Sequence, residues 1–121
     1  MNRALLVCHV SSKVGFGHLS RLLALAEKLK KDNKVVPEFL IFGDFIKKDD
    51  LGKFKVHSFS LVDDFVGSIN TTLINNEYAV LIFDLYKNHN IDNLNELFKQ
   101  LKQRDVHLIS VDALIEHCDI L

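Results

Sequence analysis

The chain has no excess of charge of either sign. Fifteen lysines and arginines face sixteen aspartates and glutamates, which gives a formal net charge of −1. Nucleic acids and anionic membranes are bound by clustered positive charge, so neither is expected as a partner. Four lysines do gather in one segment, and a solvated helix end is the preferred interpretation over a binding patch. They are Lys28, Lys30, Lys31 and Lys34.

Long apolar runs are also missing. No stretch reaches the roughly 18 apolar residues that cross a membrane. The first run, Ala4–Val7, is too short for a signal peptide and ends at Cys8 and His9. The only other cysteine is Cys118, and two such residues predict free thiols in a reducing compartment. These absences together predict a cytoplasmic protein without a membrane span.

What is present predicts one folded α/β domain over residues 1–121. Hydrophobic residues make up 48% of the chain and charged residues 26%, as in ordinary globular domains. Short apolar runs rich in β-branched residues alternate with longer segments of helical period. This alternation predicts a Rossmann-like parallel sheet with helices on both faces.

The expected elements follow this alternation along the chain. Strands are predicted at Ala4–His9, Val36–Phe42, Val56–Phe59, Val80–Phe83 and Val106–Val111. Helices are predicted at Gly17–Lys31, from Asp63 or Asp64 to about Ile74, and at Ile91–Arg104.

Two points of this scheme stay open. Pro37, near the start of the second strand, is compatible with an edge strand. The last residues, Cys118–Leu121, resemble the start of a strand. Either a final edge strand closes the sheet or the chain is the first half of a larger protein, and the second interpretation is preferred.

The segment after the first strand is the predicted ligand-binding rim, because ligands bind open α/β sheets where strands end and helices begin. Gly15 and Gly17 allow unusual backbone angles and a close approach of a ligand. The N–H groups of the following helix start favour an anionic or strongly polar group. Ser11 and Ser12 add hydroxyls to the same rim. A tight strand-to-helix turn without a ligand explains the glycines equally well.

Known phosphate-binding motifs do not fit this segment. A dinucleotide fingerprint requires a third glycine where Ser20 stands, and the Gly-Lys-Ser/Thr of a P-loop is missing. The candidate chemistry comes instead from His18 and Arg21, which are three residues apart and share one side of the first helical turn.

The positive end of the helix dipole favours the neutral imidazole of His18, which can act as a general base. Arg21 can bind an anion or hold a neighbouring carboxylate. A capping histidine and a surface arginine are the alternative.

These residues carry a resemblance to a known family. The segment Gly15–Arg21, followed by Leu23–Leu29, resembles the G-x-G-H-x-x-R helix of the UDP-sugar hydrolases of pseudaminic acid biosynthesis. The motif also occurs in related spore-coat polysaccharide proteins and in glycosyltransferases of the two-domain GT-B fold. The resemblance continues in Leu81–Tyr86 and from Val111 to Leu121, so it covers most of the chain.

The resemblance implies a hydrolytic reaction of a UDP-linked amino sugar. His18 would be the base that activates water for attack on the anomeric carbon, which releases UDP and the free sugar. The other residues of the rim would bind the substrate: Ser11, Ser12, Gly15, Phe16, Gly17, Arg21, Asp84, Tyr86 and Asp112.

The resemblance further implies a second part of the site. Such proteins carry a C-terminal Rossmann-like domain that holds most of the uridine diphosphate. A C-terminal nucleotide-binding domain or a partner subunit is therefore expected, and the isolated chain should have little or no activity. A glycosyltransferase, or a non-catalytic module that binds a sugar or a partner, stays open as an alternative.

No metal and no cofactor are expected. Cys8-His9 and His117-Cys118 are adjacent pairs without the spacing of a structural zinc site. Cys8 should be a packed strand residue rather than a nucleophile. His57 and His107 are expected to be structural, and His89 to lie in a solvated loop.

Overall fold

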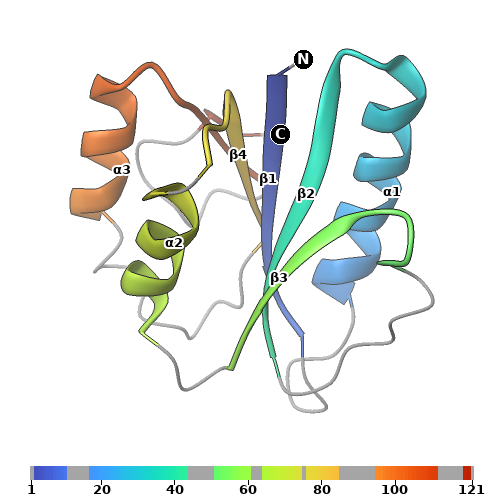
Figure 1. Cartoon of the computed structure of the whole chain (residues 1–121), viewed down its shortest axis with the longest axis horizontal. Coiled ribbons are helices and arrows are strands. Elements are labelled where there is room, and N and C mark those ends of the chain that lie inside the picture. The colour runs from blue at the N-terminus through green and yellow to red at the C-terminus, as the bar shows by residue number, and fades with distance from the viewer. Residues whose placement is uncertain are drawn as a thin grey trace.

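The protein contains a six-stranded, all-parallel sheet in the order β3-β2-β1-β4-β5-β6. In the computed structural model, residues 2–10, 17–43, 51–60, 64–74, 76–84, 95–111 and 119–120 are described. This strand order is that of the doubly wound Rossmann arrangement. Helices cover both faces of the sheet (Figure 1), so the predicted Rossmann-like α/β class is confirmed.

The elements lie close to their predicted positions. The strands are β1 (Asn2–His9), β2 (Val35–Phe42), β3 (Lys55–Phe59), β4 (Val80–Asp84), β5 (His107–Ser110) and β6 (Asp119–Ile120). The helices are α1 (Gly17–Asp32), α2 (Phe65–Ile74) and α3 (Asn95–Gln103).

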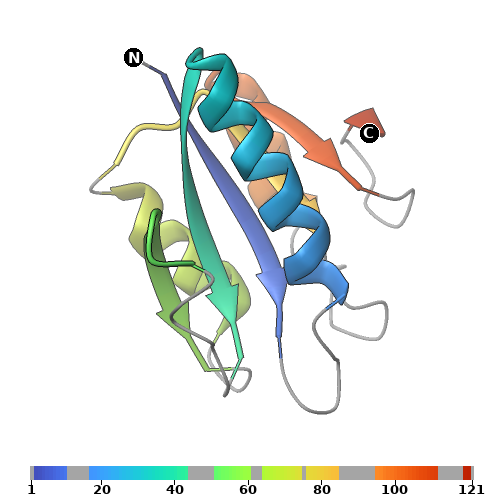
Figure 2. The ribbon, with the colours of Figure 1, turned by 90° about the vertical axis from the view of Figure 1, so that its right-hand side faces the viewer.

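Alternate strand residues face two separate apolar cores, as the period of a β-strand requires. On one face, Leu6 and Phe39 pack against the stripe of α1 that includes Leu22. Figure 2 shows α1 lying across this face. On the other face, Val7 and Phe83 pack under α2 and α3. The central strands β1, β2 and β4 are buried on both sides over most of their length, as expected for a parallel sheet.

Helix α1 ends at Asp32, one residue beyond its predicted end at Lys31. Asn33 adopts a left-handed conformation with φ of 56°, which asparagine tolerates better than most residues. Its N–H donates to the carbonyls of Leu29 and Lys30, each at 3.2 Å, and so closes the last turn. Asp64 directly precedes α2, in the capping position predicted for Asp63 or Asp64.

Two details differ from or refine the expectation. Strand β2 lies inside the sheet, between β1 and β3, and not at an edge. Pro37 is tolerated there because the pairing with β3 begins one residue later, at Glu38. At the other end, β6 pairs with β5, so a final edge strand is present. The start of the predicted third helix at Ile91 lies outside the described residues.

The carboxyl ends of the central strands are tied together beyond the sheet. Val10 N–H donates to the carbonyl of Phe42 at 2.8 Å, and Gly43 N–H donates to that of Phe59 at 2.9 Å. Gly43 approaches Val10 so closely that a Cβ at this position would lie 1.6 Å from the Val10 carbonyl oxygen. In the described ranges, no helix is long and apolar enough to cross a membrane.

Candidate functional site

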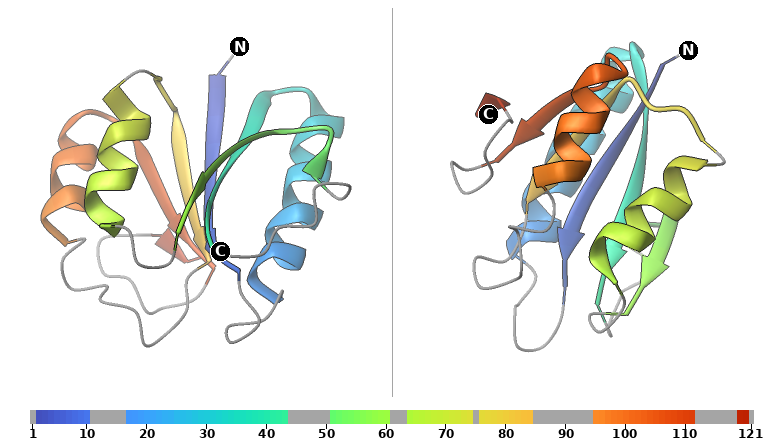
Figure 3. Two further views of the ribbon diagram at one scale, coloured as in Figure 1. Left: turned by 60° about the horizontal axis from the view of Figure 1, so that its bottom comes forward. Right: turned by 90° about the vertical axis from the view of Figure 1, so that its left-hand side faces the viewer.

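The candidate site lies where the direction of strand order reverses. From β1 the chain proceeds outward to β2 and β3, and then returns to place β4 on the other side of β1. Open α/β sheets bind ligands at this switch point, outside the carboxyl ends of the strands. Helix α1 begins at this edge, which the left panel of Figure 3 turns toward the viewer.

Asp84, the last residue of β4, is buried and faces α1. Ile82 belongs to the core beneath α1, whereas Leu81 and Phe83 belong to the core beneath α2 and α3. Since side chains alternate along a strand, Asp84 shares the side of Ile82. Its side chain has no exposed surface. A buried carboxylate requires hydrogen-bond donors, and α1 supplies them.

His18 is the first of these donors. Its Nδ1 lies 2.5 Å from Oδ1 of Asp84. A carboxylate oxygen accepts, so Nδ1 carries the proton and donates it. In the neutral ring this leaves the lone pair on Nε2, and the aspartate fixes both the tautomer and the orientation of the ring. His18 and Asp84 therefore form a dyad with the geometry of a general base and its orienting acid.

Arg21 is the second donor, one helical turn further along α1. Its Nε donates to Oδ2 of Asp84 at 2.8 Å and its Nη2 to Oδ1 at 2.7 Å. This two-point contact fixes the plane of the carboxylate as well as its position. Arg21 Nη2 also lies 3.1 Å from His18 Nδ1, but two donors form no hydrogen bond, so the atoms share Asp84. Of the two predicted uses of Arg21, holding a carboxylate is the one observed.

Cys8 lies beside the dyad, because it is the register partner of Asp84 on β1. It is fully buried, which confirms its predicted packed position. Burial, and then the nearby charge of Asp84, raise the pKa of the thiol far above its ordinary value. The thiol therefore stays protonated, and it is no nucleophile.

The predicted site residues fall into two groups. His18, Arg21 and Asp84 come together, and Gly17 precedes them as the first residue of α1. Gly17 does not use the left-handed backbone conformation that glycine permits, and among the described residues none lies within 4 Å of the position a Cβ would take there. The protein's own packing thus does not require glycine at this position. The remaining predicted positions, Ser11, Ser12, Gly15, Phe16, Tyr86 and Asp112, lie outside the described residues, as do His89, His117 and Cys118.

A second polar cluster, which the sequence analysis missed, lies at the amino ends of the strands. Glu38 is buried in β2, and its Oε1 accepts hydrogen bonds from Tyr78 Oη at 2.8 Å and His57 Nε2 at 3.1 Å. Its Oε2 accepts from Arg3 at 3.1 Å. The signal in the sequence was a single acidic residue inside the apolar run Val35–Phe42. The expected structural role of His57 is consistent with this contact.

The electrostatics of this cluster hold Glu38 in its charged form. Burial by itself raises the pKa of Glu38. The hydrogen bonds from His57, Tyr78 and Arg3, with the charge of Arg3, outweigh burial and lower the pKa below its ordinary value. Burial and the bond to Glu38 raise the pKa of Tyr78 far above its ordinary value, so the phenol remains a donor.

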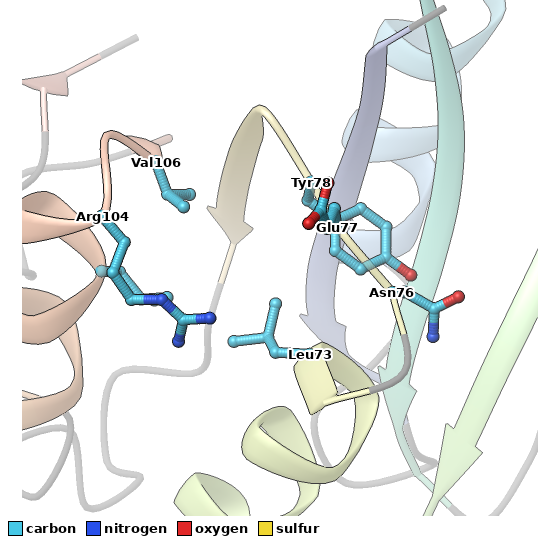
Figure 4. Close-up of a pocket in the computed structure, with 7 residues that line it drawn as sticks. Leu73, Asn76, Glu77, Tyr78, Arg104 and Val106 are labelled. Carbon is cyan, nitrogen blue, oxygen red and sulfur yellow. The ribbon is translucent and has the colours of Figure 1, made fainter.

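A cavity of about 300 Å³ adjoins this cluster at the amino edge of the sheet (Figure 4). Its apolar wall includes Leu73 and Val106, and Arg104 stands at its rim. The two polar side chains nearest the cluster are already engaged: Tyr78 bonds to Glu38, and Asn76 accepts from Arg3 at 3.1 Å. The cavity lies at the opposite edge from His18 and adds nothing to the dyad.

Within the described ranges, no group of three or more histidine, cysteine, aspartate or glutamate side chains could hold a metal ion. Comparison of the chain with protein-family models, with curated proteins and with solved structures gives no match. The candidate function therefore rests on the geometry of the dyad and on the resemblance of its sequence motif.

Proposed function

We propose that this chain supplies the catalytic base of a nucleotide-sugar hydrolase. The observation that carries the proposal is the bond from His18 Nδ1 to the buried carboxylate of Asp84. It leaves Nε2 as the basic atom at a rim where ligands of this fold class bind. The resemblance of Gly15–Arg21 to the UDP-sugar hydrolases supplies the substrate class, a UDP-linked amino sugar.

The proposed reaction is water attack at the anomeric carbon. Nε2 of His18 takes a proton from water while the water oxygen forms a bond to that carbon. The bond from the carbon to the diphosphate oxygen breaks, and the leaving UDP takes its electron pair. His18 becomes an imidazolium, which the adjacent Asp84 carboxylate stabilises. Arg21 keeps that carboxylate in place, so it acts as a positioning residue.

Two further features support the location. The first N–H groups of α1 face the rim and favour a polar or anionic ligand. No side chain or backbone atom of the described residues lies within 4 Å of the Cβ position at Gly17, which supports a close approach of a ligand to the main chain there. Contacts of the predicted substrate-binding residues with the sugar stay predictions, including any contact of Asp84 itself. The expected second nucleotide-binding domain or partner subunit is part of the same proposal.

The test is release of UDP from UDP-linked amino sugars by the complete protein. His18→Ala should lower kcat by about 10²-fold or more, since general-base catalysis contributes about 10²–10⁴-fold. Asp84→Asn should also lower kcat by about 10²-fold or more, with little change in KM, because the tautomer is no longer fixed. His107→Ala and Asp32→Asn are matched controls at the opposite edge and at the far end of α1.

Unchanged UDP release in His18→Ala, with the controls also unchanged, would refute the base assignment. Release that requires an added sugar or lipid hydroxyl would instead identify a transferase, in which the same histidine deprotonates the acceptor. Product analysis by mass spectrometry separates these two outcomes.

A further inference from the structure

The cavity at the amino edge of the sheet is lined by side chains of a single core. Its walls include Leu73 at the end of α2, Leu101 in α3, and Tyr78 and Val106 just before β4 and β5 (Figure 4). All four belong to the core beneath α2 and α3, so they lie on one face of the sheet. The volume of about 300 Å³ is at the lower end of the range for ligand pockets, about 300–1,000 Å³. A ligand of this cavity must therefore be small.

The walls of the cavity offer apolar surface that the protein itself does not cover fully. Leu101 and Tyr78 are buried, at 2% and 6% exposure. Leu73 and Val106 pack against the same core but are only partly buried. An apolar group that contacts these two side chains removes their surface and its own from water, which is favourable in proportion to the area buried. The walls thus favour the apolar part of a ligand.

Two charged side chains of opposite sign line the same cavity, Arg104 and Glu77. Both are exposed, and within the part of the chain that the structure describes neither takes part in an ion pair. The guanidinium of Arg104 extends from the end of α3 toward Leu73 (Figure 4). The other polar side chains that line the cavity, Tyr78 and Asn76, already form hydrogen bonds within the protein. Recognition of charge therefore falls to Arg104 and Glu77.

Two helix ends decide which charges the cavity accepts. Helices α2 and α3 each lead into a strand that starts at this edge, so both carboxyl ends lie here. The carboxyl end of a helix favours a positive group and disfavours a negative one, and Glu77 has the same preference. A phosphate or another simple anion is therefore disfavoured, whereas a simple cation would be repelled by Arg104. A ligand that carries one charge of each sign satisfies both sides.

We propose that the cavity beside Arg104 and Glu77 binds a small zwitterion with an apolar body, of the class of free aliphatic amino acids. The carboxylate pairs with Arg104, and the ammonium group pairs with Glu77 near the helix ends. The aliphatic side chain packs against Leu73 and Val106. Exposed ion pairs contribute little affinity alone, so the two charges and the apolar contact act together. The cavity lies at the opposite edge from His18, and this assignment does not depend on the proposed hydrolase function.

The experiment is a ligand titration of the isotope-labelled protein, followed in two-dimensional amide NMR spectra, which detect weak binding and also locate it. The first ligand is leucine. Three analogues each lack one of its features: isocaproate lacks the ammonium group, leucinamide lacks the carboxylate, and glycine lacks the apolar side chain.

The variants are Arg104→Gln and Glu77→Gln. Their matched controls are Lys102→Gln and Glu96→Gln, which remove exposed charges of the same signs on α3 without changing the described lining of the cavity. Thermal unfolding verifies that each variant is folded.

We expect leucine to shift the amide signals of Leu73, Tyr78 and Val106 and to leave those of His18 and Asp84 in place. Its three analogues should bind more weakly, because each loses one of the proposed contacts.

The variants should separate the two charges of the ligand. Arg104→Gln should weaken leucine about threefold, as expected for an exposed ion pair, and should not weaken leucinamide, which has no carboxylate. Glu77→Gln should weaken leucine by a similar factor and should not weaken isocaproate, which has no ammonium group. Lys102→Gln and Glu96→Gln should leave the affinity for leucine unchanged.

Three outcomes would overturn the proposal. The first is that the signals of Leu73, Tyr78 and Val106 stay in place up to the solubility limit of leucine. The second is that any of the three analogues binds as tightly as leucine. The third is that Lys102→Gln weakens leucine as much as Arg104→Gln does, since the effect would then come from net charge and not from the cavity.

Discussion

Asp84 shows how one buried carboxylate can organise a site. Both of its oxygens accept from α1, one from His18 and both from Arg21. The carboxylate is completely enclosed, while the Arg21 side chain is 56% exposed. Arg21 thus connects a buried group to solvent at the rim. The role proposed for the aspartate follows from these bonds more directly than from its position at a strand end.

Glu38 is the second residue whose contacts lead to a prediction. Its pKa lies below the ordinary value of 4.5, so the folded state binds its proton less readily than the unfolded chain does. The stabilisation is therefore complete above pH 4.5 and is lost as the pH falls through the lowered pKa of the folded state. At pH 7, Glu38→Gln should lower the free energy of unfolding by about 2–3 kcal/mol.

Urea unfolding of the wild type and of Glu38→Gln at a series of pH values measures this effect. The difference between them should shrink as the pH falls below about 4. Glu77→Gln is the matched control, because Glu77 is exposed at the same end of the strands. This substitution should change the free energy of unfolding by less than about 0.5 kcal/mol. A difference that is constant from neutral to acid pH would contradict the charged state assigned to Glu38.

At the scale of elements, the carboxyl edge depends on close contact between the ends of β1 and β2. Gly43→Ala would place a Cβ 1.6 Å from the carbonyl oxygen and 2.7 Å from the carbonyl carbon of Val10. Both are backbone atoms, so the strand ends must separate. We expect a loss of about 3 kcal/mol or more in the free energy of unfolding, measured by urea denaturation.

Gly17→Ala is the control for a glycine near the same edge. A Cβ at Gly17 meets nothing within 4 Å, and alanine is the better helix former. Its stability should stay within about 0.5 kcal/mol of the wild type or rise slightly. Equal losses at Gly17 and Gly43 would show that the close approach to Val10 is not the cause.

The elements themselves were largely predictable from the sequence. The apolar stripe Leu19, Leu22, Ala26 of α1 and the continuous apolar run of β4 gave their positions to within a few residues. That β2 lies inside the sheet was not predicted, because a proline gives no information on where the neighbouring strand begins to pair. That starting point is set by the register of β3, which is a long-range property.

The site was predictable in location but not in its bonds. The sequence placed His18, Arg21 and Asp84 on one rim, since α1 begins and β4 ends at the same edge. Asp84 faces α1 because of which side chains of β4 point to that face of the sheet. Its hydrogen bonds also require that α1 is rotated about its axis so that His18 and Arg21 point toward the strand. The Glu38 cluster was missed for a related reason: Arg3, His57 and Tyr78 come from three separate segments.

At the scale of the whole molecule, the two polar clusters lie on opposite faces of the sheet. The Glu38 cluster lies toward the amino ends of the strands and the Asp84 cluster at their carboxyl ends. The register partners of Glu38 and Asp84 on β1 are Leu5 and Cys8, three residues or about 10 Å apart along the strand. Among the described residues, Glu38 bonds to Arg3, His57 and Tyr78, whereas Asp84 bonds to His18 and Arg21. Each cluster is therefore expected to respond to substitution by itself.

This separation predicts additive effects on stability. The double variant Glu38→Gln with Asp84→Asn should lose the sum of the two single losses, to within about 0.5 kcal/mol, in urea unfolding at pH 7. The matched comparison is Glu38→Gln with Tyr78→Phe, whose members touch and should therefore deviate from additivity. The two clusters would not be independent if the deviation from additivity were as large for Glu38→Gln with Asp84→Asn as for Glu38→Gln with Tyr78→Phe.

The alternation of side chains along β4 limits which insertions and deletions this segment can accept during evolution. Tyr78, just before the strand, must reach Glu38 beneath α2, and Asp84, at its end, must reach His18 beneath α1. Inserting or deleting one residue between them would turn one of these side chains to the wrong face. A two-residue change would keep both faces but shift one end of the segment by about 7 Å along the strand, so the spacing from Tyr78 to Asp84 should be held at its present length.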